Sequence, residues 1–255
     1  MKHLLYIFII LTLLLSCREK KNDIVQRFQN NPKISDLNGI PLDSTCHYFP
    51  DSLFLDSITH SIDSFELLIR QVSRSYLLYK MKEPILSNYF LDKDIYRITA
   101  IRSWSKPICI RIEKSKDDIS MTIKILNKDV TGPPISRQSL HYDSLNQEKQ
   151  NVKFIQNNTT KLTSSVWDSL STLIDSTNFW KTKPRLDLNH TQIDGSTWII
   201  EGQNKFGYQV KVIPSPRFNY LHTMININEY DLNDRYTAIF LFIFRTAKLT
   251  NERLY

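Results

Sequence analysis

Apolar residues recur at alternating spacings of three and four between residues 62 and 79, which is the period of an amphipathic helix. The spacing predicts a helix from Ser64 to about Lys82. Asp63 and Glu66 form a capping-box arrangement at its start, and Pro84 lies just beyond its end. The helix therefore presents one apolar stripe, made of Ile62, Phe65, Ile69, Val72, Tyr76 and Tyr79.

Three short runs rich in β-branched residues follow this helix. Ile108–Lys114 and Ile119–Leu126 place isoleucine or methionine at every second position, and Lys116-Asp117-Asp118 supplies a turn between them. Alternation of period two is typical of an antiparallel sheet with one covered face. Together with Ile95–Trp104, these runs predict a β-meander.

Strand-like and helix-like segments also follow one another in the second half. Val152–Ile155 is a candidate strand, and Thr163 has the side chain of an N-cap ahead of a helix that contains Val166, Leu170, Leu173 and Ile174. Ser196–Glu201 and Tyr208–Ile213 are bracketed by three of the five glycines and predict a β-hairpin.

Three remaining segments complete the expected order of elements. Asp129–Gln150 is polar and interrupted by prolines, which indicates a long loop. Ser215-Pro216 has the pattern of a helix start. Asp234–Lys248 could be a helix or could contain a buried strand, and its length favours the helix.

These elements predict an α+β fold: an antiparallel sheet of about five or six strands, with helices packed mainly on one face, in a single domain. The composition agrees, since 41% of the 255 residues are hydrophobic and 23% are charged, as in packed globular chains. We expect the globular domain to span residues 46–255. Residues 17–45 are polar with little periodicity, and we expect them to hold a lipid anchor and a flexible tether.

Residues 1–16 have the features of an export signal, because Lys2 precedes the apolar stretch Leu4–Leu15. A membrane-spanning helix needs about 20 apolar residues, so this stretch is short for an anchor. Leu14-Leu15-Ser16-Cys17 resembles the lipobox of bacterial lipoproteins. That resemblance implies cleavage before Cys17 and lipidation of Cys17, including a palmitate-type chain. A lipid there would place the protein at the cell membrane, with the periplasmic side favoured. The alternative is a plain secretory signal.

The formal net charge is +7 and the sequence pI is about 9.2. The lysines and arginines are scattered along the chain, which together with export argues against nucleic-acid binding and favours a basic face near anionic lipid headgroups. Cys46 and Cys109 would lie in an oxidising compartment, so a disulfide and two separate thiols both stay open.

Several short motifs occur in order along the chain: Glu83-Pro84, Tyr96-Arg97, Ile101-Arg102-Ser103-Trp104, Pro107, Arg111, Phe179-Trp180, Asp194–Gly202, Tyr208 and Ser215-Pro216. Together they resemble an uncharacterised family of bacterial exported proteins. The family has an arginine-rich strand pair and a DG-x-x-W-x-x-EG hairpin, followed by a tyrosine and a Ser-Pro turn. Because the family has no assigned activity, the resemblance implies no functional residues. Gln209 and Ile213-Pro214 stand here where members often have a histidine and an Arg-Trp pair.

Two carboxylates of this hairpin, Asp194 and Glu201, are the first candidates for chemistry. Seven residues of extended chain span about 23 Å, so the two cannot form one acid–base site as the ends of one strand. The favoured interpretation assigns Asp194 to a turn and Glu201 to a cross-strand ion pair with an arginine. The candidate binding or structural residues are Arg97, Arg102, Trp104, Arg111, Trp180, Asp194, Trp198, Glu201 and Tyr208.

The sequence contains no metal-binding spacing among its histidines and cysteines, and no nucleophile elbow, Walker loop or dinucleotide fingerprint. We therefore expect no metal and no cofactor. The favoured function is a lipid-anchored envelope protein that acts by binding, with an envelope protein as partner. The alternatives are a carboxylate-dependent hydrolase acting on envelope glycans or lipids, and a purely structural envelope component.

Overall fold

The fold is known from a computed structural model that describes residues 26–51, 64–102, 105–116, 118–130, 151–183, 185–186, 196–214 and 227–249. Within these ranges, one sheet runs through the molecule in the strand order β4-β3-β2-β1-β6-β7-β5. Six strands pair antiparallel, and the two-residue strand β5 pairs parallel with β7. This is the α+β class that the sequence predicts.

The bounds of β1, β2, β3, β6 and β7 follow the predicted segments to within two or three residues. β4 overlaps its predicted segment, Val152–Ile155, only at the start, and β5 is not predicted from the sequence. The meander and the hairpin are confirmed, with a turn at residues 204–207 between the hairpin strands. The strands are β1 (Asp94–Arg102), β2 (Ile108–Ser115), β3 (Asp118–Leu126), β4 (Phe154–Lys161), β5 (Arg185–Leu186), β6 (Ser196–Asn204) and β7 (Gly207–Pro214).

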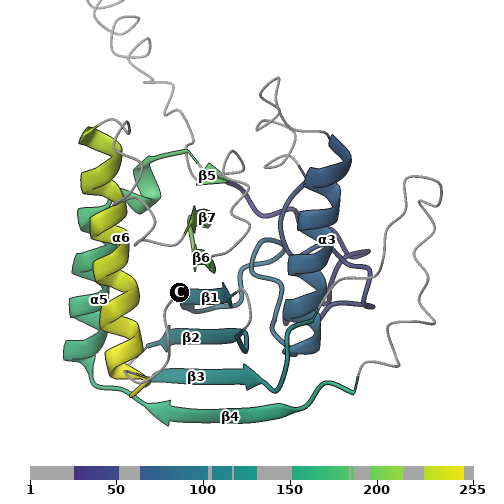
Figure 1. The fold of residues 1–255 in the computed structure, drawn as a ribbon, viewed down its shortest axis with the longest axis horizontal. Helices are drawn as coiled ribbons and strands as arrows, with labels where there is room; N and C mark the ends of the chain where they lie inside the picture. The colour runs from purple at the N-terminus through teal and green to yellow at the C-terminus, as the bar shows by residue number, and fades with distance from the viewer. Residues whose placement is uncertain are drawn as a thin grey trace, which may run out of the picture.

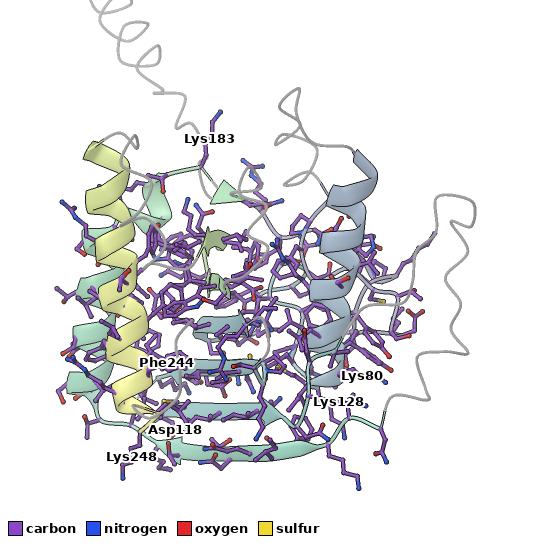
Figure 2. All side chains as sticks on the ribbon, viewed as in Figure 1. Lys80, Asp118, Lys128, Lys183, Phe244 and Lys248 are labelled. Carbon is purple, nitrogen blue, oxygen red and sulfur yellow. The ribbon has the colours of Figure 1, made fainter. Side chains whose placement is uncertain are left out.

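The helices lie on both sides of the sheet. α5 (Ser164–Ser176) and α6 (Ile227–Thr246) lie side by side on one side of the strands, and α3 (Ser64–Lys80) lies on the other (Figure 1). A 3₁₀ turn, Phe179–Lys181, follows α5. Side chains fill the space between the strands and both sets of helices (Figure 2). Thr163 is the N-cap residue of α5, as expected, although its side chain makes no capping hydrogen bond.

The face toward α5 and α6 carries the larger apolar core. Trp198 of β6 lies at its centre, with its ring centroid 4.2 Å from that of Phe240 and 5.9 Å from that of Phe244, both on α6. Apolar residues at alternate positions of β1, β2 and β3, most of them isoleucines, extend this core, which also includes Trp167, Leu170 and Ile174 of α5. The amphipathic pattern that predicts these elements is therefore the pattern that buries them.

The opposite face is also covered, which differs from the expectation of a sheet with one covered side. The polar positions of the meander point toward α3, and several of them are fully buried. Tyr76, Leu77 and Met81 of the α3 region form a second apolar core with Ile95, Ile199 and Tyr208 of the sheet. The polar residues at alternate positions of the meander are therefore buried on the α3 side rather than exposed to solvent.

The assignment of residues 17–45 to a flexible tether is wrong for residues 26–45. Backbone hydrogen bonds join Gln26 to Tyr208, and Asn30 to Asn88. Ser35 is buried and accepts a hydrogen bond from Asn88 Nδ2 at 2.7 Å. The folded domain thus includes chain at least as far back as Gln26. Residues 17–25, the Pro-interrupted segment 131–150 and the predicted helix start at Ser215-Pro216 lie outside the described residues.

Candidate functional site

Four of the candidate residues meet on the α3 face of the sheet, around Arg97 in β1. The strand register sets Arg97 opposite Glu201 of β6 on one side and opposite Arg111 of β2 on the other. Arg97 Nε and Nη2 each donate a 2.7 Å hydrogen bond to a different carboxylate oxygen of Glu201. The hydroxyl of Tyr208 donates to Glu201 at 2.9 Å. The predicted cross-strand ion pair is therefore present, and both partners are fully buried.

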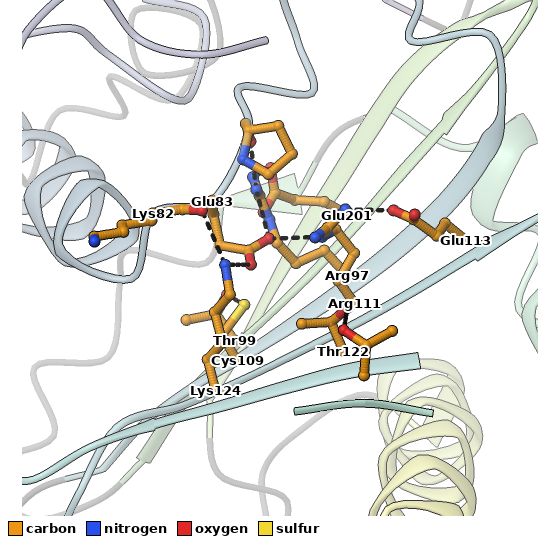
Figure 3. A network of polar contacts seen from close by, with 12 residues as sticks. Lys82, Glu83, Arg97, Thr99, Cys109, Arg111, Glu113, Thr122, Lys124 and Glu201 are labelled. Atoms are coloured by element: carbon orange, nitrogen blue, oxygen red, sulfur yellow. Dashed lines mark hydrogen bonds and ion pairs between the residues drawn. The ribbon is translucent and has the colours of Figure 1, made fainter. Parts of the chain in front are cut away.

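A second carboxylate, that of Glu83, packs against the same face of the sheet. Glu83 follows α3 and contacts three cations on three strands: Arg97 Nη1 at 3.6 Å, Arg111 Nε at 3.0 Å and Lys124 Nζ at 2.7 Å (Figure 3). Its side chain is almost completely buried. One carboxylate thus fastens the segment after α3 to β1, β2 and β3 together.

Backbone carbonyls of the same segment complete the coordination of the cations. Arg97 Nη1 donates to the carbonyl of Pro84 at 2.6 Å, and Lys124 Nζ donates to the carbonyl of Lys82 at 2.9 Å. Tyr48 stacks over the guanidinium of Arg97, 5.7 Å from its ring centroid, and its hydroxyl donates to the carbonyl of Glu83. Arg111 also pairs with Glu113. We call Glu83, Arg97, Arg111, Lys124 and Glu201 the ionic cluster.

The pKa values of Glu83 in the ionic cluster and of its neighbour Tyr208 are both shifted away from neutral pH. Burial by itself would raise the pKa of Glu83, but Arg111, Arg97 and Lys124 outweigh it and hold that pKa below its ordinary value of 4.5. Burial raises the pKa of Tyr208 well above its ordinary value, and Glu201 adds to the effect. Glu83 stays ionised and Tyr208 stays protonated, which suits a fixed ionic frame better than acid–base catalysis.

The other candidates lie on the opposite face of the same strands. Trp198 is in the core below α6, and Trp180 donates from its indole nitrogen to the hydroxyl of Tyr96 at 3.4 Å. Arg102 is buried and donates twice to the carbonyl of Lys106. These three residues do not join the ionic cluster. Trp104, Asp194 and the lipidation candidate Cys17 lie outside the described residues, so the predicted roles of all three stay predictions.

The packing of two aromatic rings explains why the hairpin motif ends in a glycine, Gly202. A Cβ at this position would lie 2.6 Å from Phe179 Cε1 and 2.9 Å from two atoms of the Trp180 ring. A strand residue with no side chain is required here because the two rings pack directly on the backbone. Trp198, Glu201 and Gly202 therefore have three different packing roles along one strand.

The cysteines and histidines add no further chemistry in the part of the chain that the structure describes. Cys46 and Cys109 are both free thiols, and burial raises the pKa of each. His47 contacts Asp51 at 2.8 Å and Gln71 at 3.2 Å. Across the described ranges, no three His, Cys, Asp or Glu side chains gather as metal ligands, and no helix has both the length and the apolarity to cross a membrane.

No family model matches this chain, and no curated protein or solved structure matches it either. The resemblance to a family of exported proteins therefore stays a prediction. The structure nevertheless supplies a physical reason for many of the residues that carry the resemblance, since Glu83, Pro84, Arg97, Arg111, Glu201 and Tyr208 all contribute to the ionic cluster or its immediate contacts.

Sequence reasoning missed Glu83 and Lys124 as members of the cluster. Glu83 sits at the end of a helix, where a carboxylate is ordinarily solvated, and only the Glu-Pro pair in the motif singled it out. Lys124 is one of several polar residues at alternate positions of β3. Neither position carries a local signal of burial, because burial depends on how the segment after α3 crosses the sheet.

The central ion pair should show strong coupling in a double-mutant cycle. Removing one partner leaves the other charge buried, so Arg97→Met and Glu201→Leu should each cost about 3–5 kcal/mol of unfolding free energy. The double variant should cost less than the sum of the two by at least about 1 kcal/mol. Urea denaturation measures all three. As a control, Asp118→Asn, which disrupts the exposed pair with Lys161, should cost less than about 1 kcal/mol. Additive costs for the buried pair would contradict this assignment.

The ionised Glu83 should make stability fall in acid. Its pKa is lower in the folded protein than its ordinary value of 4.5, so its contribution is present above that pH and is lost as pH falls through the folded pKa. Glu83→Gln should therefore be less stable than the wild type at about pH 7, and the gap should narrow toward about pH 3. Urea midpoints across this range measure the gap, and a gap independent of pH would show that folding does not lower the pKa of Glu83.

Proposed function

We propose that this protein is a lipid-anchored component of the bacterial cell envelope that acts by binding an envelope protein rather than by catalysis. The observation that carries the proposal is an apolar turn on the surface, formed by residues 35–42. Leu37, Ile40 and Leu42 are 73%, 60% and 59% exposed, and they are three of the five large hydrophobic side chains exposed in the described part of the chain. Three such side chains within six residues form a cluster rather than isolated surface residues.

The turn is held in one conformation by its own hydrogen bonds. Asp36 accepts from the backbone N–H groups of Asn38 and Ile40 at 2.9 and 2.8 Å, and its own N–H donates to the carbonyl of Ile40. Ser35 and Pro41 form a β-bridge beneath it. A preformed apolar surface loses little conformational entropy when a partner covers it, which favours a binding role.

The turn also contacts the segment that packs on the ionic cluster. Gly39 has φ of +76°, and its carbonyl accepts from the N–H of Ile85 at 2.7 Å. A Cβ on Gly39 would lie 3.0 Å from Pro84 Cβ and from the Ile85 carbonyl oxygen, so the close approach requires glycine. Pro84, in turn, accepts from Arg97. The exposed turn is therefore connected to the ionic cluster through the Pro84–Ile85 segment.

The hydrolase alternative has less support. A glycan hydrolase of the usual kind needs two carboxyl groups that face substrate, one of them able to donate a proton. Glu83 and Glu201 are buried among arginines and lysine, and the low pKa of Glu83 keeps it ionised. The carboxylates at the centre of the described sheet are thus committed to the fold. A purely structural envelope component would not need a preformed apolar turn.

The proposal predicts that the turn captures a partner in cells. We expect Leu37→Ser, Ile40→Ser and Leu42→Ser combined to lower the yield of a specific crosslinked partner by about tenfold or more, since fully burying one Leu or Ile side chain contributes about 1.5–3 kcal/mol. Unfolding free energy should change by no more than about 1 kcal/mol, because the side chains are exposed. In-cell crosslinking with quantitative mass spectrometry, with Cys17 intact, measures the yield.

Two control variants make this test specific. Ile155→Ser removes an aliphatic side chain that is 52% exposed on the edge strand β4, outside the turn, and should keep the wild-type yield. Cys17→Ala should abolish lipid attachment, read from the mass of the mature N-terminal peptide. Equal capture by the wild type and the triple variant would contradict binding through the turn, and an unlipidated mature wild-type protein would contradict the anchor.

A further inference from the structure

The tip of the β6–β7 hairpin exposes an aromatic residue beside a cation. Phe206 is 74% exposed, and Lys205 Nζ lies 5.0 Å from the centroid of its ring. The Asn204 side chain accepts a hydrogen bond from the N–H of Phe206 at 2.8 Å, which fixes the turn. Exposing an aromatic ring at a rigid tip is costly in water, whereas an aromatic ring with an adjacent lysine is well suited to the interface between water and lipid.

The chain that leads back toward Cys17 meets the sheet at this same hairpin. Gln26 and Tyr208 exchange two backbone hydrogen bonds, of 3.1 and 2.9 Å, and Tyr208 is two residues from Phe206. Gln26, the first residue that the structure describes, therefore lies beside the hairpin, two residues along β7 from its tip. The exposed turn at residues 35–42 comes later in the chain, after the backbone has passed along Ser87 and Asn88.

The short separation between Cys17 and Gln26 limits how far this end of the domain can lie from a lipid on Cys17. Gln26 is nine residues beyond Cys17. Nine residues reach at most about 30 Å even when fully extended. A lipid on Cys17 would hold the hairpin tip close to the bilayer surface at high effective concentration.

We propose that Lys205 and Phe206 insert into the headgroup region of the membrane that carries the Cys17 lipid. This inference rests on the proposed lipid anchor and adds an orientation to it. The Phe206 ring would lie at the boundary between headgroups and acyl chains, and the Lys205 ammonium would bind lipid phosphate. Asp94, at the start of β1, is close enough to Lys205 and Lys114 for their positive charges to offset its negative charge. The docked tip would leave the apolar turn available to a protein partner.

Lipid contact at the tip can be measured by quenching with brominated phospholipids. Full-length protein, expressed so that its lipid is attached, is reconstituted into vesicles of phosphatidylethanolamine and phosphatidylglycerol with or without bromine on the acyl chains. Phe206→Trp places a fluorophore at the tip. Ile155→Trp is the matched control, because β4 lies five strand spacings from β7, roughly 24 Å away. Fluorescence of the wild-type tryptophans is subtracted from each.

We expect brominated lipid to quench the added fluorescence of Phe206→Trp at least about twofold more than that of Ile155→Trp, since an interfacial side chain lies about 5–10 Å deep in the boundary region. Equal quenching of the two, or quenching of neither while the protein co-floats with the vesicles, would overturn the inference and leave the lipid anchor intact. A protein that fails to co-float would overturn both the anchor and the inference. Crosslinking of an unquenched tip to a protein would reassign the tip to a protein interface.

Discussion

The buried ion pair between Arg97 and Glu201 is the constraint around which the rest of the described structure is arranged. Two charges removed from water are stabilised only when every donor and acceptor nearby is matched. Here the bidentate contact, the Tyr208 hydroxyl and the Pro84 carbonyl provide that match. Glu83 and Glu113 then balance the positive charges of Arg111 and Lys124. The helix α3, the segment after it and four strands are thereby held in one relative position.

This arrangement also fixes the register of the sheet. β1 and β6 are far apart in the chain, and a shift of one residue would turn Arg97 and Glu201 toward the apolar core under α6. Apolar packing alone tolerates many substitutions, whereas a buried charge has few acceptable partners. On the other face, Trp198 and Gly202 set the same strand against α6 and the ring of Trp180. We infer that the hairpin motif specifies the fold, whereas the proposed binding surfaces are the exposed turn and the hairpin tip.

Much of this fold is predictable from sequence, because the local pattern and the final burial agree. The meander, the hairpin and the last helix bury the apolar residues that their periodicity selects. Of the residues selected in α3 and α5, Val72, Tyr76, Leu170 and Ile174 are buried, whereas Tyr79, Val166 and Leu173 are partly exposed. β4 was recognised only at its start, since it is an edge strand with polar side chains from Gln156 to Lys161 and has no apolar face to reveal it. The packing of residues 26–45 and the burial of Glu83 depend on contacts between distant segments. No local pattern encodes such contacts, and the ionic cluster was therefore predicted only as a single pair.

The central claim is that the ionic cluster makes the centre of the sheet a single cooperative unit. Native-state hydrogen exchange tests it most directly, because it reports the free energy of opening at each amide. The account predicts that amides of β1 and β6 near Arg97 and Glu201 exchange only through global unfolding, with the same free energy as that from urea denaturation, while amides of the edge strand β4 open at lower cost. Exchange of the β1 and β6 amides through local opening, at a free energy below the global value, would contradict it.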